Sequence, residues 1–354
     1  MDFRRVGRWL DYRHGLTRGS LKVKGTNSMR FLLPVLLTAL VSLSIASRTA
    51  QSQLPSAEDS ASGSIVLNVT VASKSGEAVM DLDRSAFTVY DNNVVQQINY
   101  FEKTDQPLSV GIILGTQGPK VGLDRHRVPA EAVVKQGLSG FINASHKSNK
   151  YFLANFHLGK IEYLSDWTQD GSAIIDSVGR ATFRAGPLVD ACYDAVEKLI
   201  NEGDQKRVLL VFSDGRNFDS RRTLEELRRL IRGSDVLIYC VPLASFDSLG
   251  SSSYLEGEGV LYNVANDSGG RFYEPRKFSM MSAIFELIAL ELGHQYSIGY
   301  TPSRFADDGK EHRVKVKVKA PTDNAGKLVP LVIKTRETYL SNRRLLKTGL
   351  KPLP

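Results

Sequence analysis

Three short stretches of the sequence are almost entirely apolar and are too short to form helices. They span residues 108–114, 207–213 and 236–241. This continuous apolar pattern is typical of a strand in a parallel sheet that is covered by helices on both faces. Amphipathic helical patterns lie between and after these stretches, and the clearest spans residues 188–200. The alternation predicts an α/β fold class with a doubly wound, mostly parallel sheet of the Rossmann type.

Alternating apolar and polar positions flank this region at both ends. They occur at residues 64–72, and again at 312–319, where valine alternates with Arg or Lys. Such alternation predicts half-buried strands. The N-terminal strands are too few to be stable alone, so we expect a small flanking all-β domain built from N- and C-terminal strands. Within it, residues 327–335 should pair with 312–319 through the turn at 321–326.

The N-terminal region has the layout of a secretory signal. Residues 31–46 are an apolar run that follows basic residues and ends in Ser-Ile-Ala, with small residues at the cleavage positions. The run is shorter than the roughly 20 residues that a membrane-spanning helix needs. We therefore expect an extracytoplasmic protein, periplasmic or secreted, with Met29 as an alternative start. The other interpretation is a membrane anchor formed by the same residues 31–46, and only then would the membrane be a partner.

These patterns divide the chain into six regions. They are a signal-peptide region at 1–46, a linker at 47–62, an N-terminal β segment at 63–104, an α/β domain at 105–301, C-terminal β strands at 302–340 that pack with 63–104, and a basic tail at 341–354.

Charge and cysteine content refine this picture little. The net charge is +8, but most of the excess lies in residues 1–46, and the remainder is nearly balanced. No nucleic-acid-binding motif accompanies the charge, so we predict no nucleic-acid partner. The two cysteines, Cys192 and Cys240, both lie in apolar patterns. An oxidising compartment would permit a disulfide, but two buried free thiols are the expectation that we favour.

Several segments, taken in order, resemble the von Willebrand factor A-related (VWFA) domain family of secreted bacterial proteins. The segments are the strand and loop at 108–119, Val-Leu-Leu-Val-Phe-Ser-Asp-Gly at 208–215, Ser-Gly-Gly-Arg-Phe-Tyr at 268–273, and Glu-Leu-Gly-His-Gln-Tyr-Ser-Ile-Gly-Tyr-Thr-Pro at 291–302. The resemblance covers residues 63–340. It implies a von Willebrand A-like fold and a role in protein or surface interaction.

In that family a divalent ion sits at the carboxyl edge of the sheet, in a metal-ion-dependent adhesion site. The family's Asp, Ser, Ser, Thr and Asp ligands correspond here to Gly115, Gln117, Pro119, Gly186 and Asp214. A hard dication needs several oxygen ligands with negative charge, and only Asp214 keeps one. We therefore predict a degenerate site without a metal or other cofactor. Restoring the other four ligands should restore binding if the loops keep the family's geometry.

The sequence contains no Gly-x-Ser-x-Gly, His-Glu-x-x-His or Cys-x-x-Cys motif, so we predict no enzymatic activity and no catalytic residues. We expect an interaction protein that binds an unknown protein partner or an envelope surface. The candidate interaction face comprises Thr116, Gln117, Lys120, Asp214 and Arg216. A structural cell-envelope component and an enzyme with an unrecognised site are the alternatives.

Overall fold

The computed structural model describes most of the chain beyond the leader. The described residues are 64–74, 76–103, 106–116, 118, 120–121, 128–157, 160–202, 206–243, 250–275, 278–303, 309–322 and 326–341. The expected signal-peptide region, the linker and nearly all of the basic tail lie outside them. Among the described residues, no helix combines the length and apolar character needed to cross a membrane.

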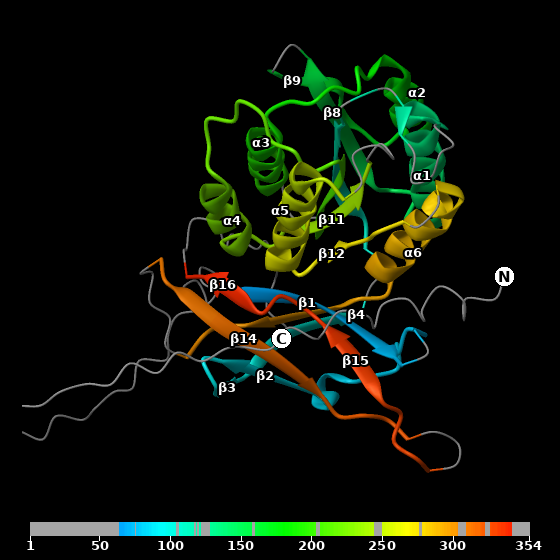
Figure 1. Ribbon diagram of the computed structural model, residues 1–354. Coiled ribbons are helices and arrows are strands. Elements are labelled where there is room, and N and C mark those ends of the chain that lie inside the picture. Colours follow the sequence, from blue (N-terminus) through cyan, green and yellow to red (C-terminus); the bar gives the residue numbers. More distant parts are fainter. Residues whose placement is uncertain are drawn as a thin grey trace, which may run out of the picture.

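A six-stranded sheet forms the centre of the α/β domain (Figure 1). Its strands are, in spatial order, β12 (Arg271–Phe272), β11 (Leu237–Pro242), β10 (Lys206–Ser213), β5 (Leu108–Gly115), β8 (Lys150–His157) and β9 (Lys160–Thr168). All neighbouring pairs are parallel except β8 and β9, which are antiparallel. Counted from β5 along the chain, the spatial order 3-2-1-4-5-6 is that of the doubly wound Rossmann fold. The predicted fold class is confirmed.

Helices cover both faces of this sheet. On one face lie α1 (Ala130–Ala144), α2 (Gly171–Ser177) and α6 (Met281–Gly293), and on the other lie α3 (Leu188–Ile200), α4 (Leu224–Arg232) and α5 (Ser252–Ser268). Short 3-10 turns occur at Arg84–Ala86, Val178–Arg180 and Phe278–Met280, and a small β6–β7 ladder joins Lys120–Val121 to Val128–Pro129.

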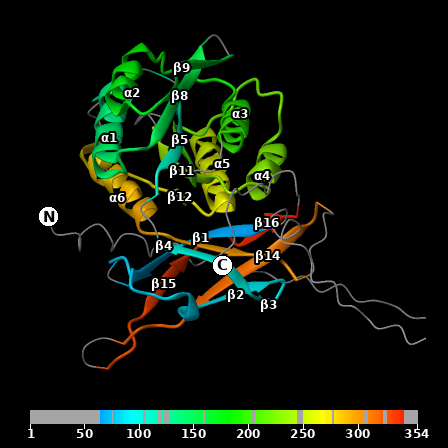
Figure 2. The same ribbon diagram turned by 180° about the vertical axis from the view of Figure 1, so that it is seen from behind.

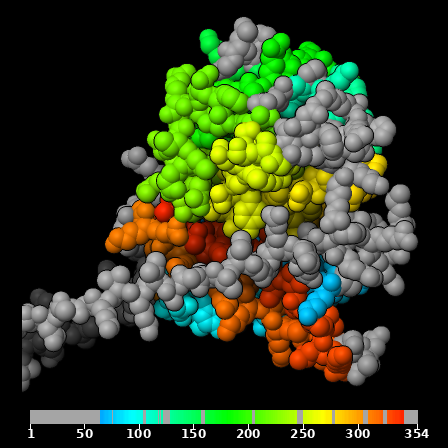
Figure 3. All heavy atoms as spheres, in the orientation of Figure 1, coloured from blue at the N-terminus to red at the C-terminus, as the bar shows by residue number. Residues whose placement is uncertain are grey.

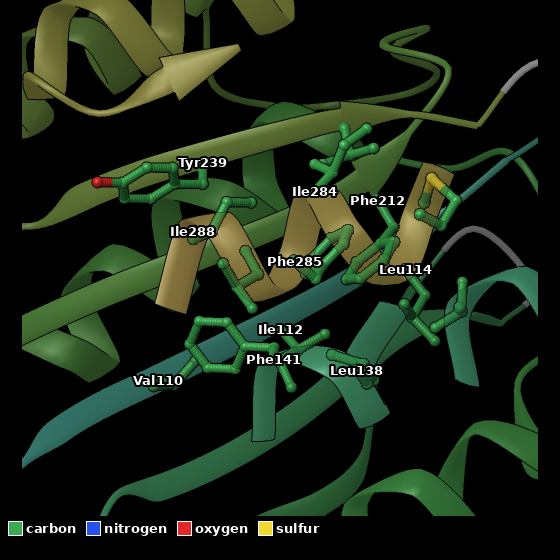
Figure 4. Packing of buried hydrophobic residues seen from close by; sticks show 14 of the residues in the cluster. Val110, Ile112, Leu114, Leu138, Phe141, Phe212, Tyr239, Ile284, Phe285 and Ile288 are labelled. Atoms are coloured by element: carbon green, nitrogen blue, oxygen red, sulfur yellow. The ribbon is translucent and has the colours of Figure 1, made fainter. Parts of the chain in front are cut away.

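Strand β5 is buried along its whole length because successive side chains enter opposite layers. Ile112 packs with α1 and α6, whereas Ile113 packs with α3. Figure 4 shows the first layer, in which the Phe212 and Phe285 rings stack with centroids 4.6 Å apart. This two-sided burial is the reason that the strand is apolar throughout.

Cys192 and Cys240 lie together in the second layer. Both are buried, both are free, and both belong to the cluster beneath α3, α4 and α5. Burial raises the pKa of the Cys192 thiol to about 12 and raises that of Cys240 well above its ordinary value. The two thiols therefore remain protonated and act as small apolar side chains.

Two antiparallel sheets form a β-domain below the α/β domain (Figures 1 and 2). One contains β15 (Leu331–Lys334), β1 (Ile65–Ser73), β13 (Tyr296–Tyr300) and β4 (Ile98–Lys103), and the other contains β16 (Thr338–Leu340), β14 (Glu311–Val318), β2 (Phe87–Asp91) and β3 (Val94–Gln96). A single apolar cluster joins the two sheets. Within it the ring centroids of Phe87 on β2 and Tyr296 on β13 lie 4.9 Å apart. The antiparallel sheets combine N- and C-terminal strands.

The predicted pairing of residues 312–319 with 327–335 is wrong. One bridge, between Thr322 and Leu328, closes the turn. Beyond it β14 pairs with β2 and β16, whereas β15 pairs with β1 in the other sheet. The two strands thereby cover the shared core from opposite sides.

Strand β13 also differs from the expected layout. We expected the α/β domain to extend to residue 301, but Tyr296–Tyr300 lies in the antiparallel sheet between β1 and β4. The Tyr296, Ile298 and Tyr300 side chains are fully buried in the core of the β-domain. The chain therefore leaves the α/β domain at the end of α6.

Candidate functional site

The carboxyl ends of β5 and β10 meet at the end of the α/β domain that faces away from the β-domain (Figure 1). Gly115 and Ser213 are register partners there, and the backbone N–H of Asp214 donates to the Gly115 carbonyl over 3.3 Å. Ligands of open α/β sheets bind beyond this edge. It is the place where the family's metal site would lie.

The described residues at this edge do not fit a metal ion. Gly115 and Gly186 offer no side-chain oxygen, and the buried ring of Phe156 occupies the space beside both. A Cβ added at Gly115 would lie 2.2 Å from Phe156 Cε2, and one added at Gly186 would lie 2.6 Å from Phe156 Cγ. An apolar ring therefore stands where ligating side chains would begin. Gln117 and Pro119 lie outside the described residues.

The Phe156 ring also corrects our expectation about restored ligands. A side chain at position 115 or 186 cannot enter unless the ring moves, since real Cβ contacts are essentially never shorter than 3.0 Å. Phe156 is enclosed by the second apolar layer and has little freedom to move. We therefore expect that substitution of the four family positions alone would not rebuild the site.

Asp214, the retained carboxylate, bonds within its own loop. It is 2% exposed, its Oδ1 accepts from the Arg216 backbone N–H at 3.2 Å, and its Oδ2 lies 3.2 Å from Arg216 Nε. These contacts give Asp214 a structural role within its own loop. The carboxylate charge is already paired with a guanidinium.

The following Gly215 is required by two constraints. Its φ of +77° lies in the left-handed region, and an added Cβ would lie 2.0 Å from the Gly257 carbonyl oxygen of α5. Gly257 in turn approaches the Asp214 carbonyl so closely that it tolerates no side chain. Helix α5 is therefore packed directly onto the carboxyl edge.

The predicted interaction face is only partly at the surface. Thr116 is buried and its hydroxyl donates to the Leu243 carbonyl over 3.0 Å. Asp214 is buried as well, so neither side chain is available to a partner. Lys120 is exposed, and Arg216 is partly exposed.

The loop after Gly215 is held by a network that sequence reasoning did not find. Asp190 is buried, and its carboxylate accepts from the backbone N–H groups of Arg221 and Arg222 at 3.0 and 2.9 Å. In return, Asn217 Oδ1 accepts from the backbone N–H of Val189 at 2.9 Å. The first turn of α3 and this loop therefore cap each other.

This anchored loop presents an aromatic side chain to solvent. Phe218 is 43% exposed, although its backbone N–H donates to the Gly186 carbonyl over 3.0 Å. The next residue, Asp219, has a φ of +57°, a conformation that costs a non-glycine residue energy. The surrounding hydrogen bonds hold the loop in this shape. An exposed aromatic residue on a rigid, strained loop is a feature that packing alone does not explain.

Asp190→Ala should destabilise the protein by about 1–3 kcal/mol, because two buried backbone donors lose their acceptor. Asp194→Ala is the matched control on the same helix. Asp194 forms an ion pair with Arg222 at 3.1 Å that is partly exposed, so its loss should cost at most about 1 kcal/mol. Urea unfolding of both variants tests this, and amide exchange at Arg221 and Arg222 should accelerate only in Asp190→Ala. Equal effects would show that Asp190 does not anchor the loop.

A second polar cluster lies in the β-domain and was also missed from the sequence. Asp91 accepts hydrogen bonds from the hydroxyls of Tyr300 and Tyr339 at 3.1 and 2.7 Å, and His312 Nδ1 lies 3.3 Å from its other oxygen. These groups come from β2, β13, β14 and β16, so the cluster connects the two antiparallel sheets.

The sequence matches no family model, and no curated protein matches it. Similar solved structures include an aerotolerance-related membrane protein from Bacteroides fragilis, with 12% identity, 53% of this chain and 98% of that chain covered, and a TM-score of 0.41. BatB from Bacteroides thetaiotaomicron has 16% identity, coverage of 52% and 98%, and a TM-score of 0.39. A von Willebrand factor type A protein from Catenulispora acidiphila has 13% identity, coverage of 73% and 77%, and a TM-score of 0.38.

Identities and TM-scores at this level carry no argument about function. The assignment of the fold rests on the order and direction of the strands, with one antiparallel strand at the β9 edge and helices on both faces. The resemblance read from the sequence is confirmed at the level of the fold: the α/β domain of this chain is von Willebrand A-like.

Proposed function

We propose that this chain is an exported, non-enzymatic protein-binding module that contacts its partner through the carboxyl-edge loop and without a metal ion. The observation that carries the proposal is Phe218, which is exposed on a loop that Asp190 and Asn217 hold rigid. Preorganised aromatic residues are the usual anchors of protein interfaces, because little entropy is lost when they bind. Figure 3 places the neighbouring α4, in yellow-green, and α5, in yellow, side by side on the surface of the α/β domain.

The arrangement of the described residues at the carboxyl edge supports metal-independent binding. Phe156 fills the space between Gly115 and Gly186, and Arg216 already neutralises Asp214. A chelator should therefore leave binding unchanged. Export rests on the apolar run at 31–46, and N-terminal sequencing of the mature protein tests cleavage after Ala46.

A structural role in the cell envelope is the second candidate. The burial of Thr116 and the close packing of Gly257 on Asp214 favour it, because the protein's own segments cover part of the expected face. The two candidates differ at Phe218, which a purely structural component would not need to expose.

A photo-reactive phenylalanine analogue at position 218, introduced into the full chain in exporting cells, tests the proposal. It should cross-link to one defined protein, whereas the same analogue at exposed Leu328 of the β-domain should not. Failure to cross-link at 218, or the same products at both positions, would favour the structural role.

With the cross-linked protein purified, Phe218→Ala should weaken its binding at least tenfold, since truncating an anchor costs about 1.4 kcal/mol or more. Leu328→Ala is the matched control, because it removes an even more exposed apolar side chain at a distant site. Calorimetric titration with and without a chelator measures both effects. Loss of binding on chelation would contradict the metal-free mechanism.

A further inference from the structure

Strand β14 presents a row of positive charges on the outer face of the β-domain. Val314, Val316 and Val318 point into the apolar cluster between the two antiparallel sheets, so the alternate residues point away from it. These residues are Arg313, Lys315, Lys317 and, directly after the strand, Lys319, and all four are exposed. The Lys319 backbone N–H donates to the Ala86 carbonyl over 2.8 Å and so continues the strand pairing. Successive cations of the row are therefore about 7 Å apart.

These four charges are not neutralised by the protein itself. No carboxylate among the described residues forms an ion pair with any of them. Surface lysines of the α/β domain do have such partners, as in the pair of Lys135 with Glu131 at 2.8 Å. Glu311, at the start of β14, is already paired with Arg232 of α4 at 2.6 Å.

The neighbouring segments add little negative charge to this face. Glu337 is exposed, and its backbone carbonyl accepts from the Val314 N–H. Asp83 is also exposed, but it is followed directly by Arg84. The face therefore keeps an excess of positive charge.

An aromatic and an apolar side chain border the row of cations. In the register of the antiparallel strands, Tyr90 of β2 lies opposite Lys315, and Val95 of β3 lies opposite Tyr90. Lys317 Nζ is 4.9 Å from the centroid of the Tyr90 ring. Val95 is 59% exposed at the edge of the sheet. The three strands thus present a cationic strip and, beside it, a less polar strip.

This face points away from the α/β domain. The other antiparallel sheet lies between them, and its strand β1 contacts the α/β domain through the Thr70 hydroxyl, which donates to Glu291 of α6 at 3.3 Å. Figures 1 and 2 show β2 and β3 on the side of the β-domain that is farther from the α/β domain. The carboxyl edge, with its exposed Phe218, faces the opposite way.

We propose that this face of the β-domain binds the surface of a bilayer that contains anionic phospholipids. The four cations contact the lipid phosphates, while Tyr90 and Val95 reach the boundary between headgroups and acyl chains, where such side chains are stabilised. A soluble polyanion would use the cations alone, whereas a bilayer also accommodates the less polar strip. Binding in this orientation directs the carboxyl-edge loop away from the bilayer. The contact requires neither residues 31–46 nor Phe218.

Sedimentation with lipid vesicles tests the proposal. Protein purified from exporting cells should bind phosphatidylcholine vesicles that contain phosphatidylglycerol more tightly than vesicles of phosphatidylcholine alone. About 1 M NaCl should remove this difference, because it shortens the Debye length to about 3 Å. Equal affinity for the two kinds of vesicle would overturn the proposal.

Lys315→Gln combined with Lys317→Gln should weaken binding to the anionic vesicles about 25-fold, since each cation near an anionic bilayer strengthens binding about fivefold. The matched control is Lys160→Gln combined with Arg184→Gln, which changes the net charge equally at exposed positions near the carboxyl edge. It should leave binding within about twofold of wild type, because both positions are farther than a Debye length from the bilayer. The N-terminal region is the same in all variants. Equal losses in the two variants would show that this face is not the contact.

Tryptophan fluorescence locates the contact without removing a charge. Val95→Trp should show blue-shifted emission on the anionic vesicles, whereas Leu255→Trp, at an exposed position on α5, should not. A shift in Leu255→Trp alone would place the bilayer at another face and contradict the proposal. Binding of soluble polyphosphate without any binding of vesicles would assign the cations to a soluble polyanion and also overturn it. These readouts are separate from cross-linking at position 218, so either proposal can fail alone.

Discussion

Glu291→Gln should destabilise the protein by about 3–5 kcal/mol at pH 7, the largest effect that we expect from a single polar substitution. The change keeps the size of the side chain but removes the one negative charge that faces Arg271 across 3.2 Å. A buried cation without its partner loses both hydration and the attraction that replaced it. Urea unfolding measures the loss.

The double variant Glu291→Gln, Arg271→Met separates the ion pair from the hydrogen bonds that Glu291 accepts from the hydroxyls of Tyr239, Tyr273 and Thr70. Removing both charges eliminates the unpaired cation, so the double variant should be less destabilised than the sum of the single variants, with a coupling of about 1–3 kcal/mol. Glu256→Gln, an exposed position on α5, is the control and should change stability by less than about 0.5 kcal/mol. Strict additivity would mean that the pair is not coupled.

Phe156→Ala should cost about 3–5 kcal/mol, because it empties a well-packed site between two glycines. The ring is 2% exposed and lies against both Gly115 and Gly186. A double-mutant cycle identifies the contact. Gly115→Ala should destabilise the wild type by about 1–3 kcal/mol through overpacking and should be far less harmful when Phe156 is already alanine. Equal costs in both backgrounds would show that the ring does not fill the space at Gly115.

The Phe156→Ala substitution also tests whether a metal site can be rebuilt. Gly115→Asp, Gln117→Ser, Pro119→Ser and Gly186→Thr together should fail to bind Mg²⁺, since the new side chains meet the ring. Adding Phe156→Ala provides room for these side chains, and the quintuple variant should show saturable Mg²⁺ binding in a calorimetric titration. Binding of Mg²⁺ by the quadruple variant, which retains Phe156, would contradict the role assigned to this ring.

Much of the α/β domain could be predicted because its signals are local. The almost entirely apolar strands β5, β10 and β11 and the amphipathic helix α3 carry their burial pattern in their own sequences, and their alternation indicates a doubly wound sheet. The positions that lack metal ligands could likewise be read from Gly115 and Gly186. The aromatic ring beside these glycines could not be predicted, because Phe156 lies on β8 and its local sequence indicates only a strand residue.

The missed features depend on contacts between distant parts of the chain. β14 and β15 alternate as hairpin strands would, and nothing local indicates that they belong to different sheets. Asp190 has the spacing of an ordinary helix residue, yet its partners are backbone groups of a loop after another strand. Glu291 resembles a surface residue of α6 until β1 is placed against it. In each case the decisive partner is specified by the tertiary arrangement alone.

The position of β13 between β1 and β4 has a consequence for how the chain acquires its structure. The chain enters the α/β domain from β4 and leaves it directly into β13, and these two strands are themselves paired, Lys103 opposite Tyr296. Once the α/β domain has formed, its two ends are held together, so the strands of the β-domain meet across a short effective loop. Closing that loop has an entropic cost that grows with the logarithm of the loop's length. Folding of the α/β domain has by then already offset this cost. We therefore infer an order of events in which the inserted domain acts as a template and the outer sandwich assembles last, after the C-terminal strands become available.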